Sequence, residues 1–174
     1  MCPNGTIHDT STGFLVFGMV VTCTVSALGS IGNLLTLCTI IHQCCLPKSM
    51  RSIDNITADT VLIFNLALAD FFYSFISLPP IFITYLFEHL NIDPWGFQHG
   101  CTICTITAFL CYTTAIAEWT TLGVMAIERC TSIYKFRQSN RRSKLFTPTR
   151  TIFICCAIWV AAISAQIGPL LDVR

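Results

Sequence analysis

Four long apolar stretches constrain this chain more than any other feature of its sequence. They cover residues 14–41, 61–86, 101–127 and 151–171. Each is long enough to cross the hydrocarbon core of a bilayer, which takes about 20 residues of helix. Because every backbone polar group within lipid has to be paired inside its own segment, such stretches predict helices rather than strands. The sequence therefore predicts an all-α membrane protein, with residues 1–174 forming one domain.

The charge content agrees with a membrane protein and excludes an ordinary soluble domain. Of the 174 residues, 53% are hydrophobic and only 11% are charged, whereas about a quarter of the residues of a soluble domain are charged. Within the four apolar stretches only Asp70 and Glu118 carry a charge. A carboxylate inside a bilayer is costly unless it is paired or protonated, so both residues are predicted to be functional.

The distribution of basic residues predicts how the chain is oriented. Segments 1–13 and 87–100 contain no lysine or arginine, whereas segments 42–60 and 135–150 contain eight. Because basic connections stay in the cytosol, we expect a multi-pass protein of the cell membrane with an extracellular N-terminus. Asn4 begins an Asn-Gly-Thr sequon on the outer side and is the expected glycosylation site. The basic residues are Lys48, Arg51, Lys135, Arg137, Arg141, Arg142, Lys144 and Arg150.

Polar residues of three predicted helices fall at one depth in the membrane. Asp70 lies ten residues from Thr60 and Glu118 lies eleven residues before Arg129, which places both about 15 Å from the cytosolic end. Asn33, in the first stretch, is about 12 Å deep. Two carboxylates at one site cannot both ionise without a cation, so either a proton is shared or a sodium ion is bound. The alternative is that Glu118 faces another helix and stays protonated against a backbone carbonyl.

One face of the third stretch collects most of its polar residues. At helical spacing this face carries a cysteine near the outer end, Glu118 in the middle and Arg129 at the cytosolic end, and we expect function there. The face comprises Cys104, Ala108, Cys111, Ala115, Glu118, Leu122, Met125 and Arg129. Cys101 and Cys104 form a CxxC pair at the outer edge, where a disulfide is more plausible than a zinc site. Cys44 and Cys45, on the cytosolic side, are either palmitoylated or plain thiols.

Several short motifs stand at characteristic places along the four stretches: Gly32-Asn33, Asn65-Leu66-Ala67-Leu68-Ala69-Asp70, Trp95, Ala126-Ile127-Glu128-Arg129-Cys130, Trp159 and Pro169. In their order and placement, these motifs resemble the rhodopsin-like (class A) G-protein-coupled receptors. The resemblance covers nearly the whole chain as the first four helices of a seven-helix bundle, at approximately 14–42, 59–87, 100–135 and 149–171. The Gly-Val-Met-Ala-Ile-Glu-Arg run looks most like the melatonin-receptor-like and orphan branch.

The resemblance implies a switch at the cytosolic end of the third helix. Glu128, Arg129 and Cys130 match the family's Asp/Glu-Arg-Tyr motif, in which the acid holds the arginine at rest and its release lets the arginine meet a G protein. Cys130 replaces the usual tyrosine. The plain alternative is an interfacial arginine that extends into the head groups. Asp70 matches the family's sodium-site aspartate, with Asn33 as its hydrogen-bonded neighbour.

The resemblance also implies a ligand pocket and a disulfide on the outer side. Cys111 stands where amine receptors carry an aspartate, which argues against an amine ligand and for a largely apolar or uncharged one. The expected pocket residues are Pro80, Thr84, Cys111, Tyr112 and Ala115. Cys104 is the expected disulfide cysteine, with Cys101 as the alternative, and its partner belongs to the second outer loop. Glu118 departs from the family, where a serine or another small residue is usual.

The predicted function is that of the N-terminal part of such a receptor, which passes an extracellular ligand signal to a heterotrimeric G protein. We expect no catalytic activity, no nucleic-acid partner and no cofactor other than the sodium ion. Four helices of a seven-helix fold are not expected to signal alone. The alternative is a complete four-span carrier or scaffold in which Asp70 and Glu118 form a cation or proton site.

Overall fold

The computed structural model describes four long helices and the residues that flank them. The described residues are 11–45, 56–90, 92, 96–139 and 146–171. Asn4 and Trp95 lie outside them, and of Cys101 and Pro169 only the helical backbone is described. The glycosylation expected at Asn4, the alternative disulfide at Cys101 and the family positions of Trp95 and Pro169 therefore stay predictions.

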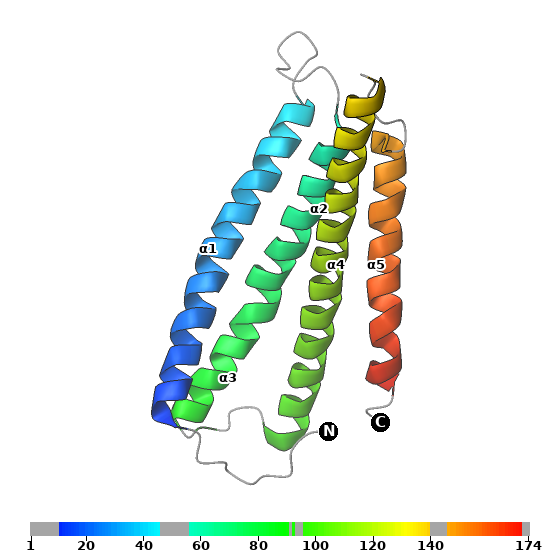
Figure 1. Cartoon of the computed structure of the whole chain (residues 1–174). Coiled ribbons are helices and arrows are strands. Elements are labelled where there is room, and N and C mark those ends of the chain that lie inside the picture. The colour runs from blue at the N-terminus through cyan, green and yellow to red at the C-terminus, as the bar shows by residue number, and fades with distance from the viewer. Residues whose placement is uncertain (1–10, 46–55, 91, 93–95, 140–145, 172–174) are drawn as a thin grey trace.

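Helices α1, α4 and α5 each cross the molecule as one uninterrupted helix, at Thr12–Cys45, Gly96–Ser139 and Pro148–Leu171. The remaining span, Ala58–Leu90, consists of α2 (Ala58–Phe72), the π-helical turn η1 (Tyr73–Ser77) and α3 (Leu78–Leu90). The spans run alternately up and down, side by side (Figure 1). All four are long and apolar enough to cross a membrane, and none of the described residues forms a strand. The all-α prediction with four membrane helices is confirmed.

The π-helical turn η1 lies immediately before Pro79 and Pro80. Neither proline has a backbone N–H, so the usual bonds to the carbonyls four residues earlier cannot form. The helical turn is instead wider by one residue, because the Leu78 N–H donates its hydrogen bond to the Tyr73 carbonyl, five residues back. The disturbance therefore lies on the N-terminal side of the two prolines, close to Asp70.

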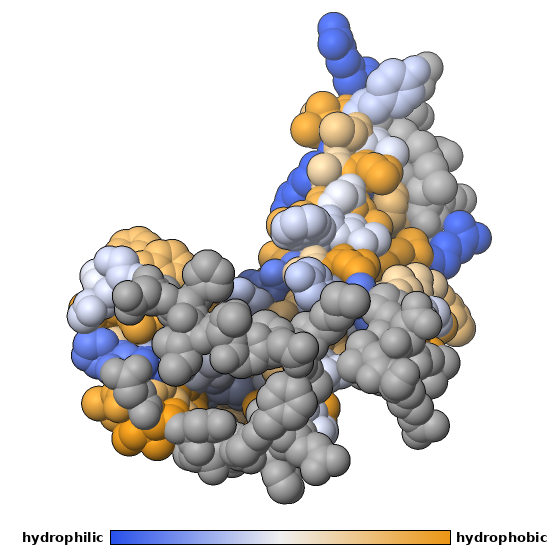
Figure 2. Space-filling model, turned by 90° about the horizontal axis from the view of Figure 1, so that it is seen from below, coloured by the Kyte–Doolittle hydropathy of each residue, from blue (hydrophilic) through white to orange (hydrophobic). Residues whose placement is uncertain are grey.

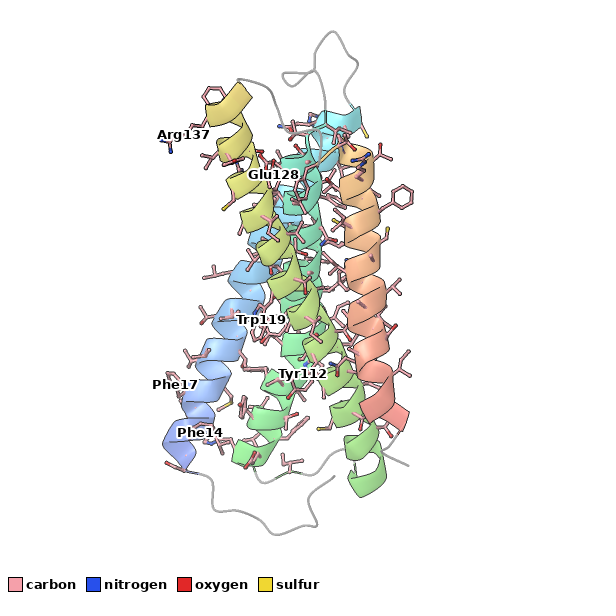
Figure 3. All side chains as sticks on the ribbon, turned by 45° about the vertical axis from the view of Figure 1, so that its right-hand side comes forward. Phe14, Phe17, Tyr112, Trp119, Glu128 and Arg137 are labelled. Atoms are coloured by element: carbon pink, nitrogen blue, oxygen red, sulfur yellow. The ribbon has the colours of Figure 1, made fainter. Side chains whose placement is uncertain are left out.

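Small residues let the helices pack closely at the centre of the bundle. Helix α4 contacts both α2 and α5, whereas α1 packs against α2 and α3. Ala69, Ala117 and Ile158, from three of these helices, form a buried core against which Trp159 packs. Without a hydrophobic force between helices in lipid, such close approach supplies the packing energy. Large apolar side chains such as Phe17 and Trp119 point outward (Figure 3).

The most buried face of α4 differs from the face that the sequence singled out. Thr114, Ala117 and Thr121 are fully or almost fully buried, whereas Glu118 is half-buried and Arg129 is exposed. The small residues face α2 and α5 because they permit close contact. The predicted polar stripe therefore lies beside the packing face, at the border of the bundle.

The close contact between α1 and η1 yields a prediction about stability. A Cβ atom at Gly29 would lie 3.0 Å from Ser74 Cβ, whereas at Gly32 it would meet no atom within 4 Å. Gly29→Ala is therefore expected to lower the free energy of unfolding by about 1–3 kcal/mol through overpacking. Gly32→Ala is the matched control and should be neutral or stabilising, because alanine favours helix. Thermal unfolding in detergent tests this, and equal shifts for both variants would contradict it.

Candidate functional site

Two carboxyl side chains meet between α2 and α4 at mid-depth. Asp70 near the end of α2 and Glu118 in α4 lie close enough for their side chains to interact. Both are half-buried, and the Glu118 Oε1 atom is buried with no hydrogen-bond partner among the described residues. Carboxyl groups this close cannot both be ionised unless a cation lies between them. The arrangement suits a shared proton or a bound cation.

Asn33 does not complete this pair as the family resemblance implies. Its Nδ2 atom donates a hydrogen bond to the Gly29 carbonyl of its own helix, at 2.9 Å. The intrahelical acceptor satisfies the amide locally, so Asn33 needs no partner on α2. Among the described residues, the side-chain interaction given for Asp70 is with Glu118, and the Asn33–Asp70 contact stays a prediction.

Three helices are joined by a buried hydrogen-bond network around Asn65. Its Nδ2 atom donates to Thr121 Oγ1 at 2.8 Å, and its Oδ1 atom accepts from Trp159 Nε1 at 2.9 Å. The Thr121 hydroxyl in turn donates a hydrogen bond to the Ala117 carbonyl, at 2.6 Å. The sequence singled out Trp159 but missed Thr121, whose role depends on which way α4 is turned. This network fixes α2, α4 and α5 relative to one another.

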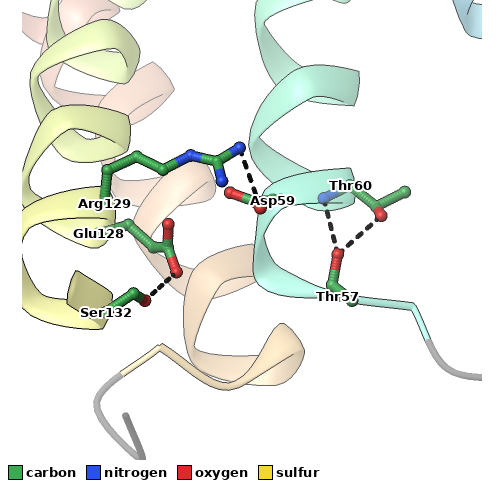
Figure 4. A network of polar contacts seen from close by, with 6 residues as sticks. All are labelled: Thr57, Asp59, Thr60, Glu128, Arg129 and Ser132. Carbon is green, nitrogen blue, oxygen red and sulfur yellow. Dashed lines mark hydrogen bonds and ion pairs between the residues drawn. The ribbon is translucent and has the colours of Figure 1, made fainter. Parts of the chain in front are cut away.

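At the other end of α4 an ion pair links that helix to α2. Arg129 Nη2 lies 3.1 Å from Asp59 Oδ2, while Glu128 Oε1 accepts a hydrogen bond from Ser132 Oγ at 2.8 Å (Figure 4). The resemblance implies that Glu128 holds the arginine, and the structure instead gives that contact to Asp59. Sequence inspection missed Asp59 because it lies 70 positions away and outside any expected motif. Cys130 is exposed.

A pocket opens between α3 and α4 at the end where α1 begins. Its volume is about 760 Å³, within the range of sites for small ligands. Pro80, Thr84, Cys111 and Tyr112 line it, as does Cys104, a free and exposed thiol. Ala115, one turn deeper, does not. Figure 2 looks onto this end of the bundle, where apolar residues are exposed along the flanks.

Comparisons with known proteins agree with this arrangement. The family model described as 7 transmembrane receptor (rhodopsin family) matches residues 32–173. The melanopsin of Phodopus sungorus is 30% identical over 146 residues, and that of Homo sapiens is 28% identical over 149. Each alignment covers 83% of this chain but only 27% and 26% of the respective relative. The chain thus spans about a quarter of the length of these relatives. They are not melatonin receptors, and the branch within the family stays a prediction.

Proposed function

This chain belongs to the rhodopsin family of seven-transmembrane receptors, and on that premise we propose that it passes a signal from an outer ligand pocket to a cytosolic G protein. The observation that carries the proposal is the placement of a pocket and an exposed arginine at opposite ends of α4. Cys104, in the pocket, and Arg129 are separated by 25 residues, or about 37 Å of helix. That length reaches from one membrane interface to the other. Figure 3 shows Tyr112 and Glu128 at these two levels of α4.

The lining of the pocket supports a largely apolar, uncharged ligand. Ile81, Ile83 and Ile103 contribute hydrocarbon surface, and Cys111 supplies a thiol where an amine ligand would need an acid. Glu88 also lines the pocket but already has an interaction partner. Pockets of this composition gain affinity mainly from apolar burial, and a few polar groups orient the ligand.

The orientation proposed for the chain is an extracellular N-terminus in the cell membrane. Figure 1 shows the start of α1 and the end of α5 at one end of the bundle, and the end of α1, the start of α2, the end of α4 and the start of α5 at the other. In the sequence, the segments that join these latter helix ends contain Lys48, Arg51, Arg141, Arg142 and Lys144. The positive-inside rule assigns the basic end to the cytosol. The pocket then opens outward and Arg129 faces the cytosol. No enzymatic activity is part of this proposal, which describes a receptor.

Reconstitution tests the proposed coupling. The receptor that carries this chain would be placed in lipid nanodiscs with purified heterotrimeric G proteins of each class, and nucleotide exchange would be measured. Exchange above that with empty discs is expected for at least one class. Because the family fold has seven helices, residues 1–174 alone should not exceed the empty-disc rate. A receptor that stimulates no class in the presence of a broad apolar ligand library would refute the proposal.

The acid pair supports a second proposal, which concerns ion binding: Asp70 and Glu118 share a proton that a sodium ion displaces. Tyr73 of η1 lies close enough to interact with both Glu118 and Cys111 of α4. Helix α1 contributes uncharged Ser30 and Asn33 at this level. A sodium ion held between the two carboxylates would take the place of the shared proton as the positive charge that lets both acids ionise. Sodium binding and protonation should therefore compete.

Substitution of Glu118 tests this competition. In the wild-type receptor, we expect lower pH to weaken the effect of sodium on ligand-free exchange. Glu118→Ser leaves only Asp70 and should reduce that pH dependence, whereas Glu118→Gln mimics the protonated acid and serves as the matched control. The measurement is a sodium titration of nucleotide exchange at several pH values. If Glu118→Ser changed neither the sodium nor the pH response, the shared site would be ruled out.

A further inference from the structure

We propose that Asp59 is the acid that holds Arg129 in the resting arrangement of this protein, an inference that rests on the proposed receptor function. The family motif would assign this role to Glu128, the residue next to the arginine. The structure instead shows a contact between helices: Arg129 extends from α4 across to the first turn of α2 (Figure 4).

Helix geometry explains why the neighbouring acid is not the partner. Side chains at adjacent helical positions point about 100° apart and do not face each other. Glu128 has a favourable partner one turn along its own helix, because Ser132 Oγ donates to its Oε1 atom at 2.8 Å. Arg129 points instead toward α2, where Asp59 Oδ2 lies 3.1 Å from Nη2.

The position of Asp59 in the first turn of α2 favours its ionised form and fixes the backbone that carries it. Thr57 caps the helix, accepting a hydrogen bond from the Thr60 N–H at 3.3 Å. Asp59 is the acidic residue of the first turn, where the helix dipole favours a negative charge. Its second oxygen, Oδ1, is buried and has no hydrogen-bond partner in the part of the chain that the structure describes. It could therefore accept another guanidinium N–H, and arginine commonly binds carboxylates through two such bonds.

The exposure of the pair suits a contact that opens during signalling. The side chain of Arg129 is 60% exposed and that of Asp59 is 31% exposed, so water screens their attraction and the pair is weak. A cytosolic partner that binds the free arginine can therefore compete for it. A ligand or partner shifts such a two-state element by its different affinity for the two states.

Matched amide variants test which acid holds the arginine. Asp59→Asn and Glu128→Gln each remove one charge and keep the side-chain shape. In the receptor that carries this chain, Asp59→Asn is expected to raise ligand-free nucleotide exchange about two- to five-fold, the range expected for loss of one exposed ion pair. Glu128→Gln should raise it less. A larger increase for Glu128→Gln than for Asp59→Asn would overturn the proposal.

A thermal double-mutant cycle on residues 1–174 in nanodiscs gives a readout that does not need signalling. The unfolding-temperature shifts of Asp59→Asn and Arg129→Gln should be non-additive, whereas those of Glu128→Gln and Arg129→Gln should add. Additive shifts for the first pair would also overturn the proposal. If the receptor, wild type included, stimulates no G protein, the proposed function fails, and this cycle still decides whether Asp59 is the partner of Arg129.

Discussion

Arg129→Ala is expected to lower receptor-stimulated nucleotide exchange by about 30-fold or more, the effect of losing one anchor residue from a protein interface. The side chain stands at the proposed cytosolic end of α4 and is largely exposed, so a partner can reach it. Its guanidinium group offers five donors in a rigid fork, and neither alanine nor lysine reproduces that geometry. The measurement is the exchange rate at saturating receptor in nanodiscs.

Two controls separate loss of contact from loss of folding. The pair with Asp59 is exposed, so Arg129→Ala should reduce the free energy of unfolding by less than about 1 kcal/mol. Arg137, farther along α4 near its end, is also exposed (Figure 3), and Arg137→Ala should reduce exchange much less. Similar losses for the two variants would show that general basic charge, rather than Arg129 itself, recruits the G protein.

Asn65→Ala is expected to destabilise the helix bundle by about 2–4 kcal/mol. Asn65 is 5% exposed, and its removal leaves the Trp159 indole N–H without its acceptor and Thr121 without its donor. A buried donor left unpaired costs its full desolvation energy, and the missing side chain adds a cavity. Unfolding by heat or by a denaturing detergent would measure the loss.

Two further variants make this prediction specific. Trp159→Phe removes one bond of the network and keeps most of the ring that packs edge-on against Phe72, so it should cost less than Asn65→Ala. Asn33→Ala removes an amide whose hydrogen bond among the described residues is to its own helix, and it should cost about 1 kcal/mol or less. If Asn33→Ala and Asn65→Ala were equally destabilising, the network would not be what holds the three helices together.

Periodicity and residue order predicted the class of fold correctly, because the bilayer leaves few choices. An apolar run of 20 or more residues has to pair its backbone internally, and this requirement gives a helix whatever its neighbours are. The order of the motifs around Asp70, Arg129 and Trp159 predicted the family, and the match over residues 32–173 confirms it. Counting residues along each helix also gave the depth of Asp70 and Glu118, because the rise per residue is constant.

Depth along a helix is thus set by the sequence alone, whereas rotation about the helix axis is decided by packing. The sequence by itself determined that this is an all-helical membrane protein and which polar groups share a layer. Only the tertiary structure decided that Asn33 turns to its own backbone, that Asn65 joins Thr121 and Trp159, and that the arginine next to Glu128 reaches Asp59. The physical reason is that small residues such as Ala69 and Ala117 set which faces approach closely. These contacts join residues far apart in the chain.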